Sequence, residues 1–338
     1  MISDALRESI KEACLEVSVA PREIHLEFPE NAAHGDYSTN VALMYAKGVG
    51  SAPRELAERI VESLQRKNIP DVERIKAAGA GFINFYLSDA FFARNLTEVV
   101  DKGENYGRGR VLEGERVMVE YTDPNPFKEF HIGHLMSNTI GESLARIVEW
   151  NGAVVVRACY QGDVGLHVAK TLWVAIGKRW PSEESPLAEK MKFLGEAYAA
   201  GSRAYEEDEK AREEVQKINK KIFERSPEIM GEYQKGRTWS LEHFEQIYKR
   251  LGTKFDVFFF ESEVWQKGVG MVKEGLGERV FEESEGAVIF RGEPPGLHTR
   301  VFVTAAGLPT YEAKELGLNV KKFEVYPDLD ESIIVTAN

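Results

Sequence analysis

The chain has 338 residues, of which 43% are hydrophobic and 29% are charged, a balance that supports two or three folded domains with a substantial core. Its formal net charge of −12 argues against a broad basic surface of the kind many nucleic-acid-binding proteins carry, although a local basic face stays open. No run approaches the roughly 20 apolar residues of a membrane helix, so no membrane partner is expected. The two cysteines, Cys14 and Cys159, are too few for a disulfide framework or a four-cysteine zinc site, and they favour a reducing cytoplasm.

Residues 1–110 are predicted to form a small α+β domain. A glycine-rich stretch at 103–114 separates this unit from the next. The capping residue Ser51, followed by Pro53 and Glu55, indicates the start of a helix. The predicted elements are a helix over 2–17, a strand over 23–28, a helix through 40–44, a helix from 51 to about 67 and a strand over 81–87.

Residues 111–338 are predicted to form an α/β domain built on a parallel sheet. The run 117–122 is mostly apolar, as in a strand buried on both faces, and a long helix and a second apolar run at 153–159 follow it. Strand, crossover helix and strand form the unit of a Rossmann-type nucleotide-binding sheet. A charged helical insertion at about 168–250 is predicted to pack outside the sheet. Further strand-like runs lie at 255–260, 287–290, 300–303 and 333–338. Because the chain stops directly after the last run, we expect a fragment of a longer protein.

The strongest chemical signal is the segment Asp123–His134, which leaves the first parallel strand and enters the long helix. Open α/β sheets bind ligands at this position. Pro124 and a second proline keep the loop extended, and His131 and His134, three residues apart at a helix start, lie side by side. Two imidazoles and the free N–H groups of the first turn can bind a polyphosphate, and Gly133 leaves room for a flat base. We interpret the segment as a nucleotide site that stabilises charge by position and electrostatics. A zinc site is disfavoured because no third ligand lies at motif spacing.

This segment resembles the signature of class I aminoacyl-tRNA synthetases, and its surroundings resemble the arginyl branch of that class. The resemblance rests on several separate motifs and covers nearly the whole chain. In the first domain, which resembles the tRNA-contacting amino-terminal domain of the family, the motifs are 34–37 and 81–85. In the second they are 120–125, 131–135, 161–165, 248–256, 261–262 and 309–315. Two positions depart from the family pattern, since Val164 stands where tryptophan is more frequent and Glu315 where aspartate is usual.

The resemblance implies a nucleotide-binding role for the residues of the signature. His131 and His134 would be the catalytic residues that bind the phosphates of ATP, with Gly133 beneath the adenine. Pro124 and Asn125 would complete the ATP site.

The resemblance also implies an arginine pocket. Glu120 and Asn125 would hold the α-amino and carboxylate groups of arginine. Tyr311, Glu315 and Glu261 would meet its guanidinium, a planar cationic fork that is matched by paired carboxylates and an aromatic surface. The extra methylene of Glu315 relative to aspartate must be absorbed by the backbone or the pocket.

Three further residues have two interpretations each. Asp163, between two glycines, either lines the site or turns the chain. Phe82 and Asn84 either contact a tRNA loop, the ring by stacking on a base, or pack within the sheet of the first domain.

Taken as a whole, the resemblance implies an arginine–tRNA ligase that uses ATP with Mg²⁺, binds tRNA(Arg), needs no zinc and is monomeric. A Lys-Met-Ser-Lys-like loop and a helical anticodon-binding domain are expected to lie beyond Asn338, so the chain alone is expected to turn over poorly. In this family, arginine activation also generally requires the cognate tRNA. Two alternatives stay open: another class I synthetase, such as a cysteinyl or glutamyl type, and a non-catalytic tRNA-binding module that kept the scaffold.

Overall fold

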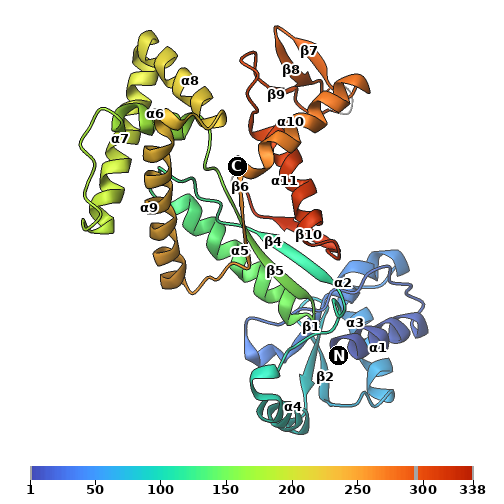
Figure 1. Ribbon diagram of the computed structural model, residues 1–338. Helices are drawn as coiled ribbons and strands as arrows, with labels where there is room; N and C mark the ends of the chain where they lie inside the picture. The colour runs from blue at the N-terminus through green and yellow to red at the C-terminus, as the bar shows by residue number, and fades with distance from the viewer. Residues whose placement is uncertain (1, 293–295, 337–338) are drawn as a thin grey trace. The chain divides into compact units, whose positions relative to one another are not determined.

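The computed structural model describes residues 2–292 and 296–336. Contacts between Cα atoms divide the chain into two units, Met1–Gly107 and Arg108–Asn338. Figure 1 shows the helices and strands of both. Within the described ranges, no helix is both long enough and apolar enough to span a membrane.

The first unit contains a three-stranded antiparallel sheet. Strand β3 (Phe82–Leu87) lies between β1 (Tyr37–Thr39) and β2 (Val72–Ala78). Its helices are α1 (Ile2–Glu16), α2 (Val41–Tyr45), α3 (Pro53–Arg66) and α4 (Asp89–Lys102). Ile83 and Phe85 of β3 are buried in one core with apolar residues of α1 and α3, because alternate residues of a strand point to the same face.

Some predictions for the first unit are wrong. The strand predicted over 23–28 is not formed: Glu27 alone pairs, through two backbone hydrogen bonds of 2.9 Å with Ser38, and the three-residue strand β1 offers no longer ladder. Ser51 does not cap the following helix, since Ala52 occupies the N-cap position without a side-chain hydrogen bond. Strand β2 and helix α4 were not predicted, because β2 buries a single fully enclosed residue and α4 buries none.

The second unit contains a four-stranded parallel sheet in the order β10-β4-β5-β6. Its strands are β4 (Arg116–Glu120), β5 (Val154–Gln161), β6 (Val257–Phe260) and β10 (Glu331–Ile334). Along the chain, β5 and β6 follow β4 on one side of it, and β10 then pairs with the opposite side of β4. This reversal creates a switch point between β4 and β10, and sheets of this kind bind ligands outside the carboxyl ends of such strands. The predicted Rossmann-type α/β fold is therefore confirmed; Ala337 and Asn338 of the last predicted run lie outside the described residues.

Helices cover both faces of the parallel sheet (Figure 1). On one face lie α5 (Ile132–Trp150) and α9 (Pro227–Leu251), and on the other α10 (Glu261–Gly277) and α11 (Tyr311–Val325). The helices α6 (Leu166–Ala175), α7 (Leu187–Glu207) and α8 (Glu209–Phe223) pack on one another and on α9. Val117 and Val119 of β4 share a core with α5 and α9, whereas Met118 shares a core with α10 and α11. The helical insertion does not lie wholly outside the sheet, because Phe244 and Tyr248, one turn apart on α9, pack against the sheet.

A second, smaller sheet lies between α10 and α11 in the sequence. It is antiparallel, in the order β7-β8-β9, with strands β7 (Glu282–Ser284), β8 (Ala287–Phe290) and β9 (Arg300–Val303). The strands predicted at 287–290 and 300–303 are therefore formed, but they pair with each other and not with the parallel sheet.

Candidate functional site

The loop that joins β4 to α5 has a strained backbone. Thr122, Asp123 and Phe127 have positive φ angles of 80°, 45° and 67°. Residues other than glycine rarely adopt this conformation, and a β-branched residue does so least of all. Strain of this kind, about 1–3 kcal/mol per residue, persists only where the surroundings hold it, and it concentrates at functional sites.

Polar groups of α5 hold the first strained residue. The backbone N–H of Thr122 donates to Ser137 Oγ at 3.0 Å, and Asn138 Nδ2 donates to Thr122 Oγ1 at 2.9 Å. Thr253 in turn donates to Asn138 Oδ1 at 2.9 Å. Ser137 also donates to the carbonyl oxygen of Val335 at 3.2 Å, just after β10. These bonds tie the loop to both strands that flank the switch point.

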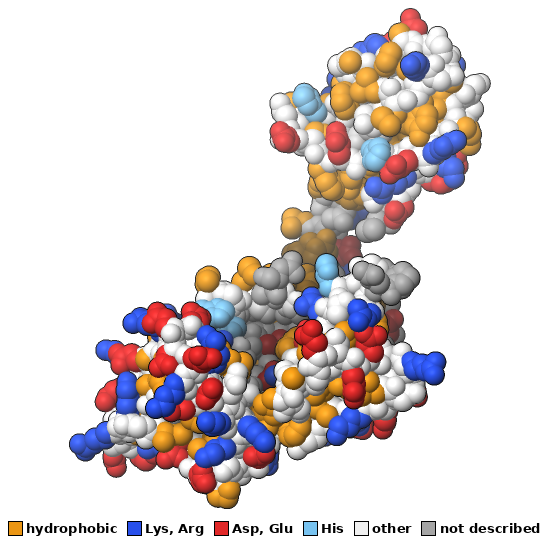
Figure 2. Space-filling model, turned by 90° about the horizontal axis from the view of Figure 1, so that it is seen from above, with side chains coloured by type: hydrophobic (Ala, Val, Ile, Leu, Met, Phe, Trp, Pro, Cys, Tyr) orange, Lys and Arg blue, Asp and Glu red, His pale blue; other side chains and the backbone are white. Residues whose placement is uncertain are grey.

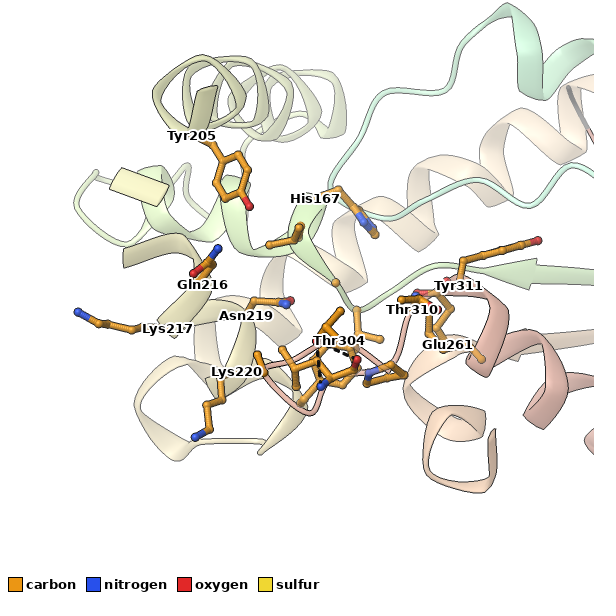
Figure 3. A pocket seen from close by; sticks show the side chains of 18 of the residues that line it. His167, Tyr205, Gln216, Lys217, Asn219, Lys220, Glu261, Thr304, Thr310 and Tyr311 are labelled. Atoms are coloured by element: carbon orange, nitrogen blue, oxygen red, sulfur yellow. Dashed lines mark hydrogen bonds and ion pairs between the residues drawn. The ribbon is translucent and has the colours of Figure 1, made fainter. Parts of the chain in front are cut away.

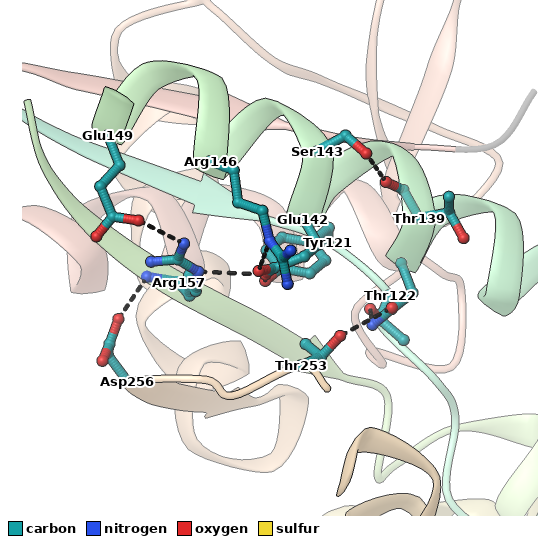
Figure 4. Close-up of polar contacts among 11 residues, drawn as sticks. Tyr121, Thr122, Thr139, Glu142, Ser143, Arg146, Glu149, Arg157, Thr253 and Asp256 are labelled. Carbon is teal, nitrogen blue, oxygen red and sulfur yellow. Dashed lines mark hydrogen bonds and ion pairs between the residues drawn. The ribbon is translucent and has the colours of Figure 1, made fainter. Parts of the chain in front are cut away.

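A charged network fixes α5 on the sheet (Figure 4). Arg157 of β5 donates to Glu142 at 3.2 Å and to Glu149 at 2.9 Å, both on α5. The Tyr121 hydroxyl donates to Glu142 Oε2, the oxygen that also accepts from Arg157, at 2.6 Å. Burial acts to raise the pKa of Glu142, but hydrogen bonds from Tyr121, Arg146 and Arg157 outweigh it and lower that pKa. The helix that carries the histidine pair is therefore anchored along its length.

Phe127 anchors the far end of the loop in the helical insertion. Its side chain is fully buried, and its backbone N–H donates to Ser240 Oγ on α9 at 2.9 Å. The ring lies against Gly236, where an added Cβ would come within 2.2 Å of Phe127 Cε1. Glycine at position 236 is therefore required for the Phe127 ring to pack against α9.

His131 and His134 cap the start of α5. Nδ1 of His131 accepts from the N–H of Gly133 at 3.1 Å, and Nδ1 of His134 accepts from the N–H of His131 at 3.3 Å. The two rings stack with centroids 3.8 Å apart and planes 20° apart. This arrangement confirms that the pair lies side by side at a helix start.

The capping bonds fix the tautomer of each neutral ring. Because Nδ1 accepts a hydrogen bond, the ring proton is on Nε2, which is then free to donate to a ligand. Burial, together with the nearby His131 and Lys128, lowers the pKa of His134 to about 4, so this ring is neutral at pH 7. The start of α5 therefore offers N–H donors of the backbone and of two imidazoles to an anion.

Four carboxylates lie close enough to influence one another near the carboxyl ends of β4 and β6. They are Glu120, Asp123, Glu261 and Glu315. Burial raises the pKa of all four, that of Glu261 to about 7. Within the part of the chain that the structure describes, no group of three or more His, Cys, Asp and Glu side chains is arranged to hold a metal ion.

Two lysines of α11, which the sequence analysis missed, compensate two of these carboxylates. Lys322 Nζ lies 2.9 Å from Glu120 Oε2, with side chains only 1% and 2% exposed. Lys314 Nζ lies 2.5 Å from Glu261 Oε2, with side chains 9% and 6% exposed. The signal was available, since the interval of eight residues between the lysines places both on the face of α11 that packs on the sheet.

Two polar atoms of this cluster have neither a hydrogen bond nor an ion pair among the described residues. Neither the Tyr160 hydroxyl nor Glu315 Oε1 has a hydrogen-bond partner among the described residues, although both are buried. Burial and the surrounding carboxylates raise the pKa of Tyr160 above its ordinary value. A buried polar atom without a partner is costly, which points to a ligand that supplies donors here.

A cavity of about 770 Å³ opens beside the cluster (Figure 3). Its volume is in the range of small-molecule sites, about 300–1,000 Å³. Asn125, Glu261 and Tyr311, all predicted to bind arginine, line it together with Lys314. Its far wall comes from α8 and from the loop between β9 and α11.

Gly162 and His167 shape the wall of the cavity beside Asn125. An added Cβ on Gly162 would lie 2.2 Å from Asn125 Oδ1, so glycine lets the two loops approach. His167 Nε2 lies 2.7 Å from the carbonyl oxygen of Gly162 and donates to it. Burial, with nearby Lys128, lowers the pKa of His167 to about 3 and keeps the ring neutral.

Asp163 is fully buried behind the cavity. Its carboxylate accepts hydrogen bonds from Arg237 Nε at 2.8 Å, from Tyr233 at 3.3 Å and from the backbone and hydroxyl of Ser262 at 2.9 and 2.8 Å. With both oxygens occupied, this side chain joins α9 to α10 and does not line the cavity. Glu120 and Glu315 also lie outside its lining, next to the Lys322 end of the cluster.

The two candidate tRNA contacts lie on β3 in the first unit and differ in exposure. The Phe82 side chain is 37% exposed, whereas Asn84 is 4% exposed and accepts a hydrogen bond of 2.9 Å from the Ser38 hydroxyl. Phe82 is therefore available to a partner, and Asn84 is part of the sheet.

Comparisons with known proteins bear on both units. The family described as "Arginyl tRNA synthetase N terminal domain" matches residues 1–87, and the family described as "tRNA synthetases class I (R), catalytic domain" matches residues 95–330. An arginine–tRNA ligase of Treponema denticola is 30% identical over all of this chain and 58% of its own length. One from Bacillus licheniformis is 32% identical over 96% of this chain and 58% of its own length. The chain thus spans 58% of the length of these two relatives.

Two solved structures share the fold. The arginyl-tRNA synthetase of Plasmodium falciparum matches with a TM-score of 0.65 and 18% identity, over 98% of this chain and 63% of that one. The arginyl-tRNA synthetase of Thermus thermophilus matches with a TM-score of 0.61 and 23% identity, over 96% and 54%. At these identities the likeness bears on the fold alone.

Proposed function

Because the chain belongs to the class I arginyl-tRNA synthetase family, we propose that it forms the arginine- and ATP-binding part of an arginine–tRNA ligase. The full reaction joins arginine to ATP as arginyl-adenylate with release of pyrophosphate, and then transfers arginine to the terminal ribose of tRNA(Arg) with release of AMP. One observation carries the proposal: a helix start with two donating imidazoles and a cluster with more carboxylates than lysines both lie at the carboxyl edge of one parallel sheet.

The charge of the cluster favours a cationic amino acid. Four carboxylates face two lysines, so two negative charges stay uncompensated when all groups are ionised. Tyr311 lies one helical turn before Glu315 on α11 and acts to lower the pKa of that carboxyl, so an aromatic ring is close to it. A guanidinium would supply the missing donors and stack on the ring. We assign the guanidinium to this pair and the α-amino and carboxylate groups to Asn125, which lines the cavity, whereas Glu120 stays paired with Lys322 behind it.

The start of α5 fits the phosphates of ATP. The Nε2–H groups of His131 and His134 and the first N–H groups of the helix can donate to phosphate oxygens as charge develops there. An added Cβ on Gly133 would lie 3.0 Å from His131 Cε1, so a side chain fits poorly at this position. Because glycine leaves the backbone uncovered here, we assign the adenine to this side. Pro124 and Asn125 complete the ATP site, and Mg²⁺ arrives with ATP as part of the substrate.

We propose tRNA(Arg) as the partner of the first unit, with Phe82 stacking on a base. The face visible in Figure 2 intersperses acidic and basic side chains, in keeping with the net charge of −12. Neither this face nor the net charge offers a broad basic surface, so we expect tRNA binding to rest on a few local contacts. We place the enzyme in the cytoplasm, as a monomer.

Isothermal titration calorimetry of arginine, lysine and glutamate, each with and without Mg²⁺·ATP, tests the proposal. Arginine is expected to bind most tightly. Tighter binding of lysine or glutamate would favour another class I synthetase, and no binding of any amino acid or of ATP would favour a non-catalytic module.

A further inference from the structure

Lys314 occupies a position that the substrate could otherwise use. It lines the cavity together with Glu261, whereas the deeper pair, Lys322 and Glu120, does not. The 2.5 Å separation and the low exposure of both side chains mean that a cation of the protein already balances the charge of Glu261. Separating such a buried pair leaves an uncompensated charge, which is strongly unfavourable.

Glu315 is one of the two carboxylates of the cluster that pair with no lysine; the other, Asp123, accepts a hydrogen bond from the backbone N–H of Tyr160 at 2.7 Å. It forms no ion pair among the described residues, its Oε1 has no hydrogen-bond partner there, and Tyr311, one helical turn earlier on α11, acts to lower its pKa. The other groups that act on Glu261 are Asp163 and Glu315, both acidic, while Tyr160 also lies nearby. Within the described part of the chain, Lys314 is thus the cation that pairs with Glu261.

Building on the proposed function, we propose that Lys314 is a positioning residue that withholds Glu261 from the substrate and directs the guanidinium of arginine to Glu315 and Tyr311. Its ammonium also fills the place that the side chain of a competing lysine would take beside Glu261. A guanidinium can still bind the open carboxylate as a planar fork, which a compact ammonium cannot do equally well. Lys314 therefore contributes to the choice of arginine over lysine.

A double-substitution cycle tests the proposal, with arginine and lysine affinities measured by calorimetry on the whole chain. E261Q leaves the Lys314 ammonium unpaired at the cavity wall and is expected to weaken arginine binding at least about tenfold by charge repulsion. Adding K314M is expected to recover most of that loss. K314M alone frees Glu261 and is expected to reduce the ratio of arginine to lysine affinity by about tenfold, or about 1.4 kcal/mol.

Two controls accompany the cycle. K314R keeps a cation beside Glu261 and should keep the arginine-to-lysine ratio within about threefold of the parent, about 0.7 kcal/mol. K321M makes the same change of charge on α11 without contacting Glu261, and should leave the ratio unchanged. Thermal unfolding by circular dichroism verifies that each variant is folded.

The outcomes are separable. If E261Q K314M binds arginine no better than E261Q, or if E261Q has no effect, Glu261 does not depend on Lys314 in this way and the proposal is overturned. An unchanged ratio in K314M also overturns it. If the parent chain binds no arginine, the proposed function itself fails, and this inference with it.

Discussion

The imidazole rings of His131 and His134 stack 3.8 Å apart, and each accepts a backbone hydrogen bond at Nδ1, so that both Nε2–H groups stay free. The same two side chains thus cap a helix and present donors. His131→Asn separates these roles, because asparagine is a good N-cap but does not reach as far. We expect the free energy of unfolding to change by less than about 1 kcal/mol while ATP affinity falls at least about tenfold. Calorimetry with ATP and urea unfolding measure the two effects; equal loss of arginine affinity would argue against a phosphate role.

The contact between Phe127 and Gly236 predicts a steric effect at a distance from the ligand. Gly236→Ala places a Cβ 2.2 Å from the Phe127 ring and should lower stability by about 1–3 kcal/mol and weaken ATP binding by moving the loop. Gly231→Ala on the same helix has nothing within 4 Å and should raise stability by up to about 1 kcal/mol. Urea unfolding of both variants is the measurement. Similar changes in the free energy of unfolding for Gly236→Ala and Gly231→Ala would contradict the proposal that Phe127 anchors the loop on α9.

The sealed pair of Lys322 and Glu120 predicts a large loss of stability. Lys322→Met leaves a buried carboxylate without its cation and should cost about 3–5 kcal/mol. Adding Glu120→Gln should restore a large part of the stability, because the uncompensated charge is removed. Denaturant unfolding measures both variants. If Lys322→Met lowers the free energy of unfolding by less than about 1 kcal/mol, the ion pair of Lys322 and Glu120 is not shielded from solvent.

Two neutral histidines, the buried His134 and the half-buried His167, predict how stability depends on pH. The pKa values of His134 and His167 are lowered in the folded chain to about 4 and about 3, so the unfolded chain binds their protons first. Their contribution to stability is present above about pH 6.5 and is lost as the pH falls toward these folded values. His167→Gln should reduce the loss of stability between pH 7 and about pH 4.5, whereas substitution of the exposed His25 should not. Urea midpoints across this range give the comparison.

The raised pKa of Glu315 predicts a pH dependence for arginine binding. Burial favours the neutral carboxyl, whereas a guanidinium favours the carboxylate, so binding releases a proton. Arginine affinity should therefore rise with pH from the ordinary glutamate pKa of about 4.5 upward. Glu315→Gln should bind arginine more weakly and with a flatter pH profile. Calorimetry in buffers of different ionisation enthalpy counts the protons, and proton uptake would contradict this assignment.

Much of the nucleotide half of the site could be predicted from the sequence because it is local. The strand, the proline loop and the histidine pair lie within 20 consecutive residues, and helix spacing alone places His131 beside His134. The position of β10 beside β4 could not be predicted, because it depends on pairing between segments about 200 residues apart, as in the bond from Arg116 to Asp330, 214 residues away. Strand β2 was hidden by its charged outer face.

The acidic half was predicted less well, because its chemistry depends on tertiary pairing. Asp163 was expected to line the site or turn the chain, but Arg237 and Ser262, 74 and 99 residues away, occupy it. Glu261 lines the cavity, as the prediction that it meets the substrate requires, but its ion pair with Lys314 could not be read from the sequence. The spacing of Lys314 and Lys322 on α11 is visible in the sequence, but their pairing with Glu261 and Glu120 could not be predicted from it.

A crystal structure of the chain with arginine and a non-hydrolysable ATP analogue is the most direct measurement. The account predicts the guanidinium against Glu315 and Tyr311, and phosphate oxygens within hydrogen-bond distance of the Nε2 atoms of His131 and His134. Phosphates bound away from the start of α5, or an arginine side chain outside the acidic cluster, would contradict it.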